Sequence, residues 1–253
     1  MRLGELNVNV TRIHARQKMS RWLGLLAFGM LAIVPATSRA ESSPIIDIAK
    51  AYGLESFGQI EAIRYTLHAE FLNRNITRSW EWSPKTDTVS YQGKDKDGNP
   101  VKATYKRSEL PSQTDAVKAI VPAFIVDQYW LLLAVHLAWD GLPAVDEGTQ
   151  KLPLSDGTAQ RIVVKYPEAG YQPGDTWDLY IGPDKRIQQL TYHRGANTPP
   201  PKIFEVAFED YKKVGPLLIA MAYRGPFDGK PGRVLFTDVS VRLTGSDNWI
   251  SAQ

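Results

Sequence analysis

Cysteine is absent from this 253-residue chain, and histidine is scarce. Without cysteine the chain can form no disulfide bond and no metal–thiolate site, and it cannot carry the lipid-modified cysteine of a lipoprotein. Its four histidines show neither the H-x-x-x-H nor the H-x-H spacing of metal ligands. The chain also has no G-x-S-x-G motif and no glycine-rich phosphate-binding loop. We therefore expect no metal and no cofactor.

Long apolar runs are absent once the first 40 residues are set aside. Residues 19–40 have a basic start, an apolar run from Trp22 to Val34 and a small-residue end, SRA, which is typical of a signal peptide cleaved before Glu41. The run is too short for a spanning helix, although an uncleaved anchor is the alternative. We predict a removed signal peptide over 1–40, one domain over 41–253, and a periplasmic protein that is not lipidated.

An excess of positive charge is absent from the predicted mature protein. Residues 1–40 hold six of the 30 Lys and Arg residues and one of the 27 Asp and Glu residues, so 24 bases and 26 acids remain, a net charge of −2. The basic isoelectric point therefore belongs to the leader. Electrostatics gives no support to a nucleic-acid partner.

Alternation of bulky and polar side chains predicts ten strands in two groups. Four lie between residues 63 and 105, behind a short helix that begins at Ser43-Pro44 and ends at Gly53. Six more lie between 161 and 243. Residues 109–140 lack the alternation and are predicted to be helical, divided or kinked at Pro122, with a loop through Gly148 after them.

Short turns favour antiparallel pairing, and ten twisted strands tend to curl. The predicted fold class is α+β, mainly antiparallel β: an open curved half-barrel of about ten strands, covered by a helical insert and an N-terminal helix. One face of the strands is consistently bulky, with Leu67, Phe71, Trp80, Trp82, Tyr105, Trp177, Leu179, Phe204, Phe208, Met221, Tyr223, Phe236 and Val241.

The most apolar stretch of the predicted domain is FIVDQYWLLLAVHLAWDG, residues 124–141, within the helical insert. Its ten-residue core would rise about 15 Å as a helix, half the thickness of a bilayer's hydrocarbon layer. We therefore expect it to lie against the curved sheet. It would be either a plug that fills the core or a lid over a cavity.

Three segments resemble those of a family of uncharacterised exported proteins near the LolA/LolB-like outer-membrane lipoprotein carriers. DQYWLLLAVHL resembles the family's (N/D)-x-Y-W-L-L segment, GYQPGDTWDLYIGPDKRIQQLTYH its Gly-x-x-Pro-Gly-Asp segment with two strands, and WEWSPKTDTVSY its aromatic second and third strands. The resemblance covers most of residues 55–243. It implies an open curved sheet with helices over its mouth, and a cavity that shelters acyl chains in transit between membranes.

On this basis we predict a protein that binds a lipid or other apolar ligand, with a possible transient membrane or envelope-protein partner. The expected ligand-binding residues are Arg78, Trp80, Trp82, Tyr129, Trp130 and Leu133. Asp127 and His136 are expected to be structural or polar partners, and Arg78 is more readily explained by pairing with Asp127 than by a headgroup contact. We expect no catalytic residue, because no second carboxylate or histidine is placed beside Asp127 by spacing.

Two other functions remain open from the sequence. The first is an envelope interaction or scaffold module without a ligand, in which the same aromatic residues would fill the core. The second is an envelope hydrolase, for which Asp127 and His136 are the candidates.

Overall fold

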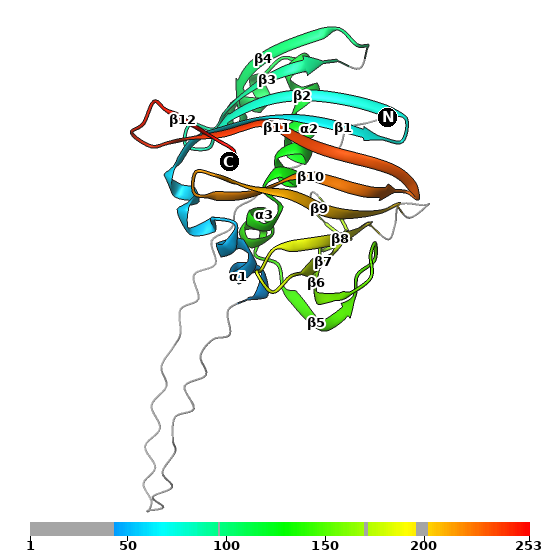
Figure 1. The fold of residues 1–253 in the computed structure, drawn as a ribbon. Coiled ribbons are helices and arrows are strands. Elements are labelled where there is room, and N and C mark those ends of the chain that lie inside the picture. Colours follow the sequence, from blue (N-terminus) through cyan, green and yellow to red (C-terminus); the bar gives the residue numbers. More distant parts are fainter. Residues whose placement is uncertain (1–42, 96, 170–171, 196–201) are drawn as a thin grey trace, which may run out of the picture. The chain divides into compact units, whose positions relative to one another are not determined.

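The structure is a computed structural model that describes residues 43–95, 97–169, 172–195 and 202–253. This part of the chain has an α+β fold with one large, open antiparallel sheet and few helices (Figure 1). The fold class predicted from the sequence is thereby confirmed. The predicted signal peptide and its cleavage site before Glu41 lie outside the described residues.

The sheet has twelve strands in the order β4-β3-β2-β1-β11-β10-β9-β8-β7-β6-β5, with β12 paired to β11. Each neighbour on this path is antiparallel, as expected for strands that follow one another in sequence; the β1–β11 pair, whose strands are distant in the chain, is antiparallel as well. The strands are β1 Ile60–Phe71, β2 Arg74–Ser83, β3 Thr88–Lys94, β4 Pro100–Lys106, β5 Ala144–Lys151, β6 Thr158–Lys165, β7 Thr176–Ile181, β8 Ile187–Arg194, β9 Lys202–Val214, β10 Leu217–Phe227, β11 Lys230–Leu243 and β12 Trp249–Ser251.

The ten predicted strands are present, and two more had not been predicted. The expected loop through Gly148 is instead the edge strand β5, whose residues are almost all exposed. An edge strand without a buried face needs no bulky alternating side chains, so the sequence pattern gave no signal. The other strand, β12, has three residues, which is too short for a periodicity to show.

The N-terminal helix α1, Pro44–Ala51, begins at the predicted Ser43-Pro44 pair. The tyrosine that follows it ties this end of the chain to the sheet. Tyr52 Oη accepts a hydrogen bond from the backbone N–H of Ile187 at 2.9 Å. It also lies 2.5 Å from Tyr211 Oη, and Tyr211 Oη donates to the carbonyl of Ile187 at 2.7 Å. These bonds form a closed ring, so the buried hydroxyls are satisfied. The 3-10 helix η1, Leu54–Gln59, leads into β1.

The helical insert is confirmed, but its division lies elsewhere than predicted. After the 3-10 helix η2, Arg107–Ser112, helix α2 runs from Asp115 to Leu131 without interruption at Pro122. Pro122 is exposed, so the helix carbonyl that loses its partner can face water. The chain bends by 104° at Leu132 instead, and α3, Leu133–Asp140, follows.

No single helix among the described residues has the length and hydropathy to cross a membrane. Helices α2 and α3 reach that threshold only when they are counted together across their bend.

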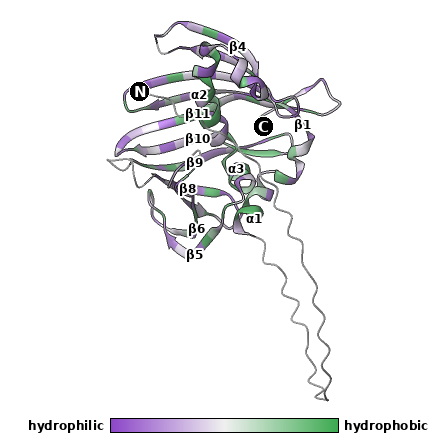
Figure 2. Ribbon diagram, turned by 180° about the vertical axis from the view of Figure 1, so that it is seen from behind, coloured by the Kyte–Doolittle hydropathy of each residue, from purple (hydrophilic) through white to green (hydrophobic). Residues whose placement is uncertain are grey.

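The helices lie on one face of the sheet, called the inner face below: it is the face on which Trp80 and Trp82 of β2 contact Phe124 of α2. Helix α2 runs across the strand direction, and α3 packs against α1 (Figures 1 and 2). The ends of β1, β10 and β11 extend past α2 in both views. Helix α2 therefore covers part of the inner face and leaves the far ends of these strands without a helix above them.

Candidate ligand-binding site

The contact between α2 and β2 is a closely packed aromatic core. Phe124 is fully buried, and its ring lies 5.3 Å from the Trp80 ring and 6.0 Å from the Trp82 ring. Trp80 also contacts Tyr91 of β3 at 4.5 Å between ring centroids. Trp80 and Trp82 were predicted to contact a ligand; in the structure both rings contact Phe124 and are almost fully buried.

Asp127 is the polar centre of this core. Only 1% of its surface is exposed, and its Oδ2 accepts a hydrogen bond from Trp80 Nε1 at 2.9 Å. The same oxygen lies 2.9 Å from Arg78 Nε, so the internal pairing predicted for Arg78 is present. Burial raises the pKa of the Asp127 carboxyl to about 6, and the Arg78 charge and the Trp80 hydrogen bond lower it by less.

The Arg78 ion pair is close but poorly aligned. Although Nε and Oδ2 are 2.9 Å apart, the buried Nε–H makes no hydrogen bond of acceptable geometry to any described residue. The Arg78 side chain is 21% exposed, whereas the Asp127 side chain is 2% exposed. Arg78 thus lies at the border between the part of the inner face that α2 covers and the part that it leaves open.

Tyr129 and His136 belong to a second polar cluster, at the junction of α2 and α3. Tyr129 Oη donates to Asp140 Oδ2 at 3.0 Å and also contacts Tyr166 Oη, which donates to the same carboxylate. The His136 ring stacks on Tyr129 at 4.6 Å, and its Nε2 lies 3.0 Å from Gln128 Oε1. Burial lowers the pKa of His136 to about 4, so the ring is neutral at pH 7.

This second cluster holds the bend between the two helices closed, and it does not include Asp127. Asp127 and His136, the two residues considered for a hydrolase, have different partners: Trp80 and Arg78 for the first, Gln128 and Tyr129 for the second. Leu133, another predicted ligand contact, is 3% exposed at the start of α3. The described residues contain no cluster of three or more His, Cys, Asp or Glu that could hold a metal ion.

Trp130 lies in an environment different from that of Trp80 and Trp82. Its ring is half-buried and contacts Trp177 of β7 and Tyr223 of β10, each at 5.6 Å. Tyr223 Oη also donates to the Trp130 carbonyl at 2.9 Å, which fixes this turn of α2 on the sheet. Trp130 is therefore a predicted site residue that lies on the inner face and still reaches solvent.

From Trp130 a continuous series of rings crosses the inner face; we call it the aromatic row. Its successive ring contacts measure 5.6, 4.5, 5.6, 5.1 and 5.0 Å between centroids. Its strands, from β7 to β1, are separated by five strand spacings, or about 24 Å. The members in order are Trp130, Trp177, Tyr192, Phe204, Phe227 and Phe71.

The far end of the row depends on a glycine. Gly232 of β11 pairs with Gly225 of β10, beneath the stacked rings of Phe71 and Phe227. A Cβ atom at Gly232 would lie 2.5 Å from Phe227 Cδ2 and 2.9 Å from Phe71 Cβ. Only a residue without a side chain lets the two rings meet across β11.

Trp177 and Phe227 are buried, but Phe71, Tyr192, Phe204 and Trp130 are only half-buried. A flank of α2 faces the same direction as Trp130: Ala119, Ala123 and Asp127 precede it at spacings of eleven, seven and three residues, which share one side of a helix. Ala119 is exposed and Ala123 is half-buried. This flank carries small side chains beside the open part of the inner face.

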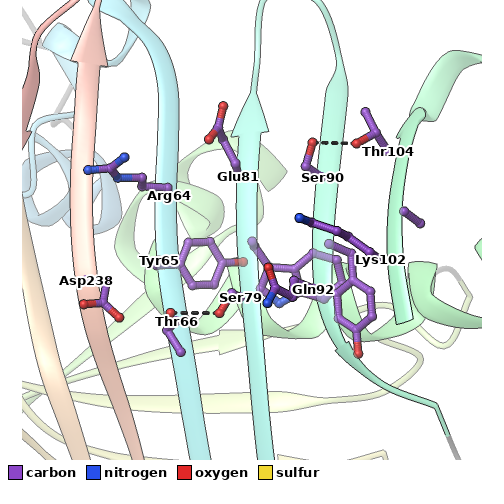
Figure 3. Close-up of a pocket in the computed structure, with 13 residues that line it drawn as sticks. Arg64, Tyr65, Thr66, Ser79, Glu81, Ser90, Gln92, Lys102, Thr104 and Asp238 are labelled. Carbon is purple, nitrogen blue, oxygen red and sulfur yellow. Dashed lines mark hydrogen bonds between the residues drawn. The ribbon is translucent and has the colours of Figure 1, made fainter. Parts of the chain in front are cut away.

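Two depressions lie away from the inner face. One, of about 310 Å³, is on the opposite, outer face of β11, β1, β2, β3 and β4 and is lined by charged and hydroxyl side chains (Figure 3). There Thr66 bonds Ser79 at 3.0 Å and Ser90 bonds Thr104 at 2.9 Å, which is the arrangement of a solvated polar sheet face. The other, of about 480 Å³, lies between the end of α1 and the β7–β8 and β9–β10 turns.

Sequence reasoning found part of this site. Phe71, Trp177 and Phe204 were on the predicted bulky face, but they were not proposed as ligand contacts. Tyr192 and Phe227 had no distinguishing signal, because nothing in a strand's alternation says where a covering helix ends. The Asp140–Tyr166 contact joins residues 26 positions apart and needed the fold.

No protein-family model and no curated protein matches the sequence. Among solved structures, the chain is similar to a DUF1329 family protein from Desulfovibrio piger ATCC 29098, a crystal structure at 1.75 Å resolution. The two share 8% sequence identity and a TM-score of 0.42, over 81% of this chain and 96% of the other.

Proposed function

We propose that this protein is a periplasmic binding protein that holds a lipid or another apolar molecule on the inner face of its sheet, beside α2. The observation that carries the proposal is the aromatic row. Six rings in unbroken contact cross the inner face, and four of them stay half-buried although they lie on the core-facing side. Partly exposed aromatic rows of this kind suit a long apolar guest.

The energetics favour a hydrocarbon chain as the guest. Each CH₂ group removed from water gains about 0.8 kcal/mol, so a sixteen-carbon chain gains about 12 kcal/mol before the losses of association are subtracted. The row's length of about 24 Å is of the order needed to accept such a chain in extended form. Its action would be non-covalent: binding, shielding from water and release, the last during transient contact with a membrane or an envelope protein.

A second function is favoured by one specific observation. Phe124 fills the space between Trp80 and Trp82, so the part of the inner face beneath α2 has the packing of an ordinary core. If the open part is equally complete without a guest, the protein is an envelope interaction or scaffold module. The two functions make opposite predictions for ligand binding.

Native mass spectrometry of freshly purified protein tests the proposal first. A binding protein should carry a co-purified mass of lipid size, released on activation. Titration with a fluorescent fatty acid then compares Trp130→Ala with Trp139→Ala. Trp139 is a matched control, because it lies on the same insert, is 44% exposed and contacts Phe57 and His136 instead of the row.

Trp130→Ala should stay folded and bind about tenfold more weakly, whereas Trp139→Ala should bind as the parent does. If Trp130 is simply core, its truncation should instead destabilise the fold by about 3–5 kcal/mol. A bare protein mass, together with no fluorescent titration in the parent protein, would refute lipid binding and favour the scaffold.

A further inference from the structure

Resting on the proposed function, we infer that the guest of the inner face carries an anionic group, a carboxylate or a phosphate, and that Arg78 binds it. The protein would then select amphiphiles with a charged head over neutral chains of equal length. The inference depends on the position, exposure and unused donors of Arg78, and on the charges around it.

Arg78 has unused hydrogen-bond donors on the side away from Asp127. A guanidinium has five N–H groups. The structure shows only the Nε side of Arg78 in contact with Asp127, and no hydrogen bond from its two terminal nitrogens to any described residue. Because the side chain is 21% exposed at the edge of α2, these nitrogens can reach a guest. A bidentate carboxylate or phosphate is the partner that fits a guanidinium fork.

A buried polar group close to Arg78 also lacks a hydrogen-bond partner. The Tyr65 hydroxyl, close enough to Arg78 and Asp127 for both charges to act on its pKa, is buried without a hydrogen-bond partner among the described residues. Asp127 is the acid of this cluster, and its Oδ2 is already shared by Trp80 and Arg78. An anionic group on a guest would supply the acceptor that the terminal N–H groups of Arg78 lack in the described part of the chain.

The strands around Arg78 also carry positive rather than negative side chains on the inner face. The alternating positions of β2, β3 and β4 that lie on the face of Trp80 include Arg74 and Arg78 and no acidic residue. Glu81, the one acidic residue of these three strands, lies on the opposite face and lines the outer depression (Figure 3). With the charge of Asp127 subtracted, Arg74 and Arg78 leave one net positive charge on this part of the inner face, which favours a negative group.

Arg78 also lies next to the aromatic row. Its partner Asp127 is three residues from Trp130 on α2, and side chains at this spacing are neighbours, about 5–6 Å apart between Cβ atoms. An anionic head at Arg78 thus places the attached chain within one helical turn of the first ring of the row. In this arrangement Asp127 is a positioning residue: it holds the Nε side of the guanidinium and leaves the other nitrogens for the guest.

The test compares three amphiphiles with the same sixteen-carbon chain: palmitate, hexadecyl phosphate and neutral hexadecanol. Each displaces a bound fluorescent probe from the purified protein at pH 8. The parent should bind at least one anionic amphiphile about tenfold or more tightly than hexadecanol, as expected for a charge-assisted hydrogen bond. The better of palmitate and hexadecyl phosphate identifies the head as carboxylate or phosphate.

The decisive variant is the double substitution Arg78→Gln with Asp127→Asn, which removes the arginine without leaving an unpaired buried carboxylate. It should keep hexadecanol binding and lose the preference for the anion. The control is Arg64→Gln, on the neighbouring strand but on the outer face, where Arg64 bonds Ser240 at 2.7 Å. This control should bind all three amphiphiles as the parent does.

The outcomes separate the two proposals. If none of the three amphiphiles displaces the probe, the proposed function fails, and the inference fails with it. If hexadecanol binds as tightly as both anions, or if the double variant keeps the preference, the function stands and the role of Arg78 is overturned. Loss of the preference in Arg64→Gln would also overturn it, because the anion would then bind on the outer face.

Discussion

The sharpest physical prediction concerns Asp127, where burial and an ion pair act in opposite directions on one carboxyl. Desolvation raises its pKa, and Arg78 and Trp80 lower it by less, so that it rises from 3.8 to about 6. A raised pKa means that the folded protein holds this proton more tightly than the unfolded chain does. The group's contribution to stability is therefore greatest below pH 4 and is lost as the pH rises to about 6.

The magnitude follows from the same values. The difference between 3.8 and about 6, at 1.36 kcal/mol per pH unit, is about 3 kcal/mol. Asp127→Asn removes this titration but keeps the side-chain volume. Because the unfolded carboxyl is already partly ionised at pH 4, the variant should gain about 2 kcal/mol of this relative to the parent between pH 4 and pH 7.

The assay is urea unfolding of the parent and the variant at pH 4, 5, 6 and 7, followed by circular dichroism. Taking the difference between the two proteins at each pH cancels the other titrating groups. Asp115→Asn, an exposed residue at the start of α2, controls for the loss of one negative charge. A difference that is flat over this range, or in which the parent gains with rising pH, would show that the Arg78 pair dominates and that the reasoning is wrong.

Three further predictions address other parts of the fold. Tyr52→Phe leaves the buried Ile187 N–H without its acceptor and should lower the free energy of unfolding by about 1–3 kcal/mol, measured by urea unfolding with the exposed Thr86→Val as control. Gly232→Val should cost about 1–3 kcal/mol and loosen the Phe71–Phe227 stack, because its Cβ would sit 2.5 Å from Phe227; parent-like stability and parent-like near-ultraviolet circular dichroism would contradict this. Burial lowers the pKa of His136 from 6.5 to about 4, so His136 contributes stability above pH 6.5 that is lost as the pH falls to 4. In His136→Gln the free energy of unfolding should therefore fall by about 3 kcal/mol less between pH 6.5 and pH 4 than it does in the parent. The same fall in both proteins, measured by urea unfolding, would refute this.

Local pattern was sufficient for most of the secondary structure. The alternation through Leu67, Trp80 and Tyr105 correctly predicted strands and a shared bulky face, because a half-buried strand must place its large side chains every second residue. The same rule failed for β5, which buries almost nothing, and the division of the helical insert lies at Leu132 instead of Pro122. The pairing of Arg78 with Asp127 could also be predicted, because a charge on a bulky face needs a partner.

Burial of the individual site residues could not be predicted in this way. Trp80, Trp82 and Trp130 were all predicted to contact a ligand, yet the first two are packed under Phe124 and the third is half-buried at the start of the aromatic row. The difference arises from where α2 crosses the sheet, which depends on the 104° bend at Leu132 and on contacts such as Tyr223 to the Trp130 carbonyl.

Composition and periodicity are properties of neighbouring residues, and they were enough for the class of fold, the strand faces and the position of the helical insert. The extent of the inner face that stays open arises from contacts between residues far apart in the chain, such as Phe71 with Phe227 and Asp140 with Tyr166. Such contacts form only when the sheet curves and the helix lies across it, so the tertiary structure alone decides which aromatic rings are core and which remain within reach of a guest.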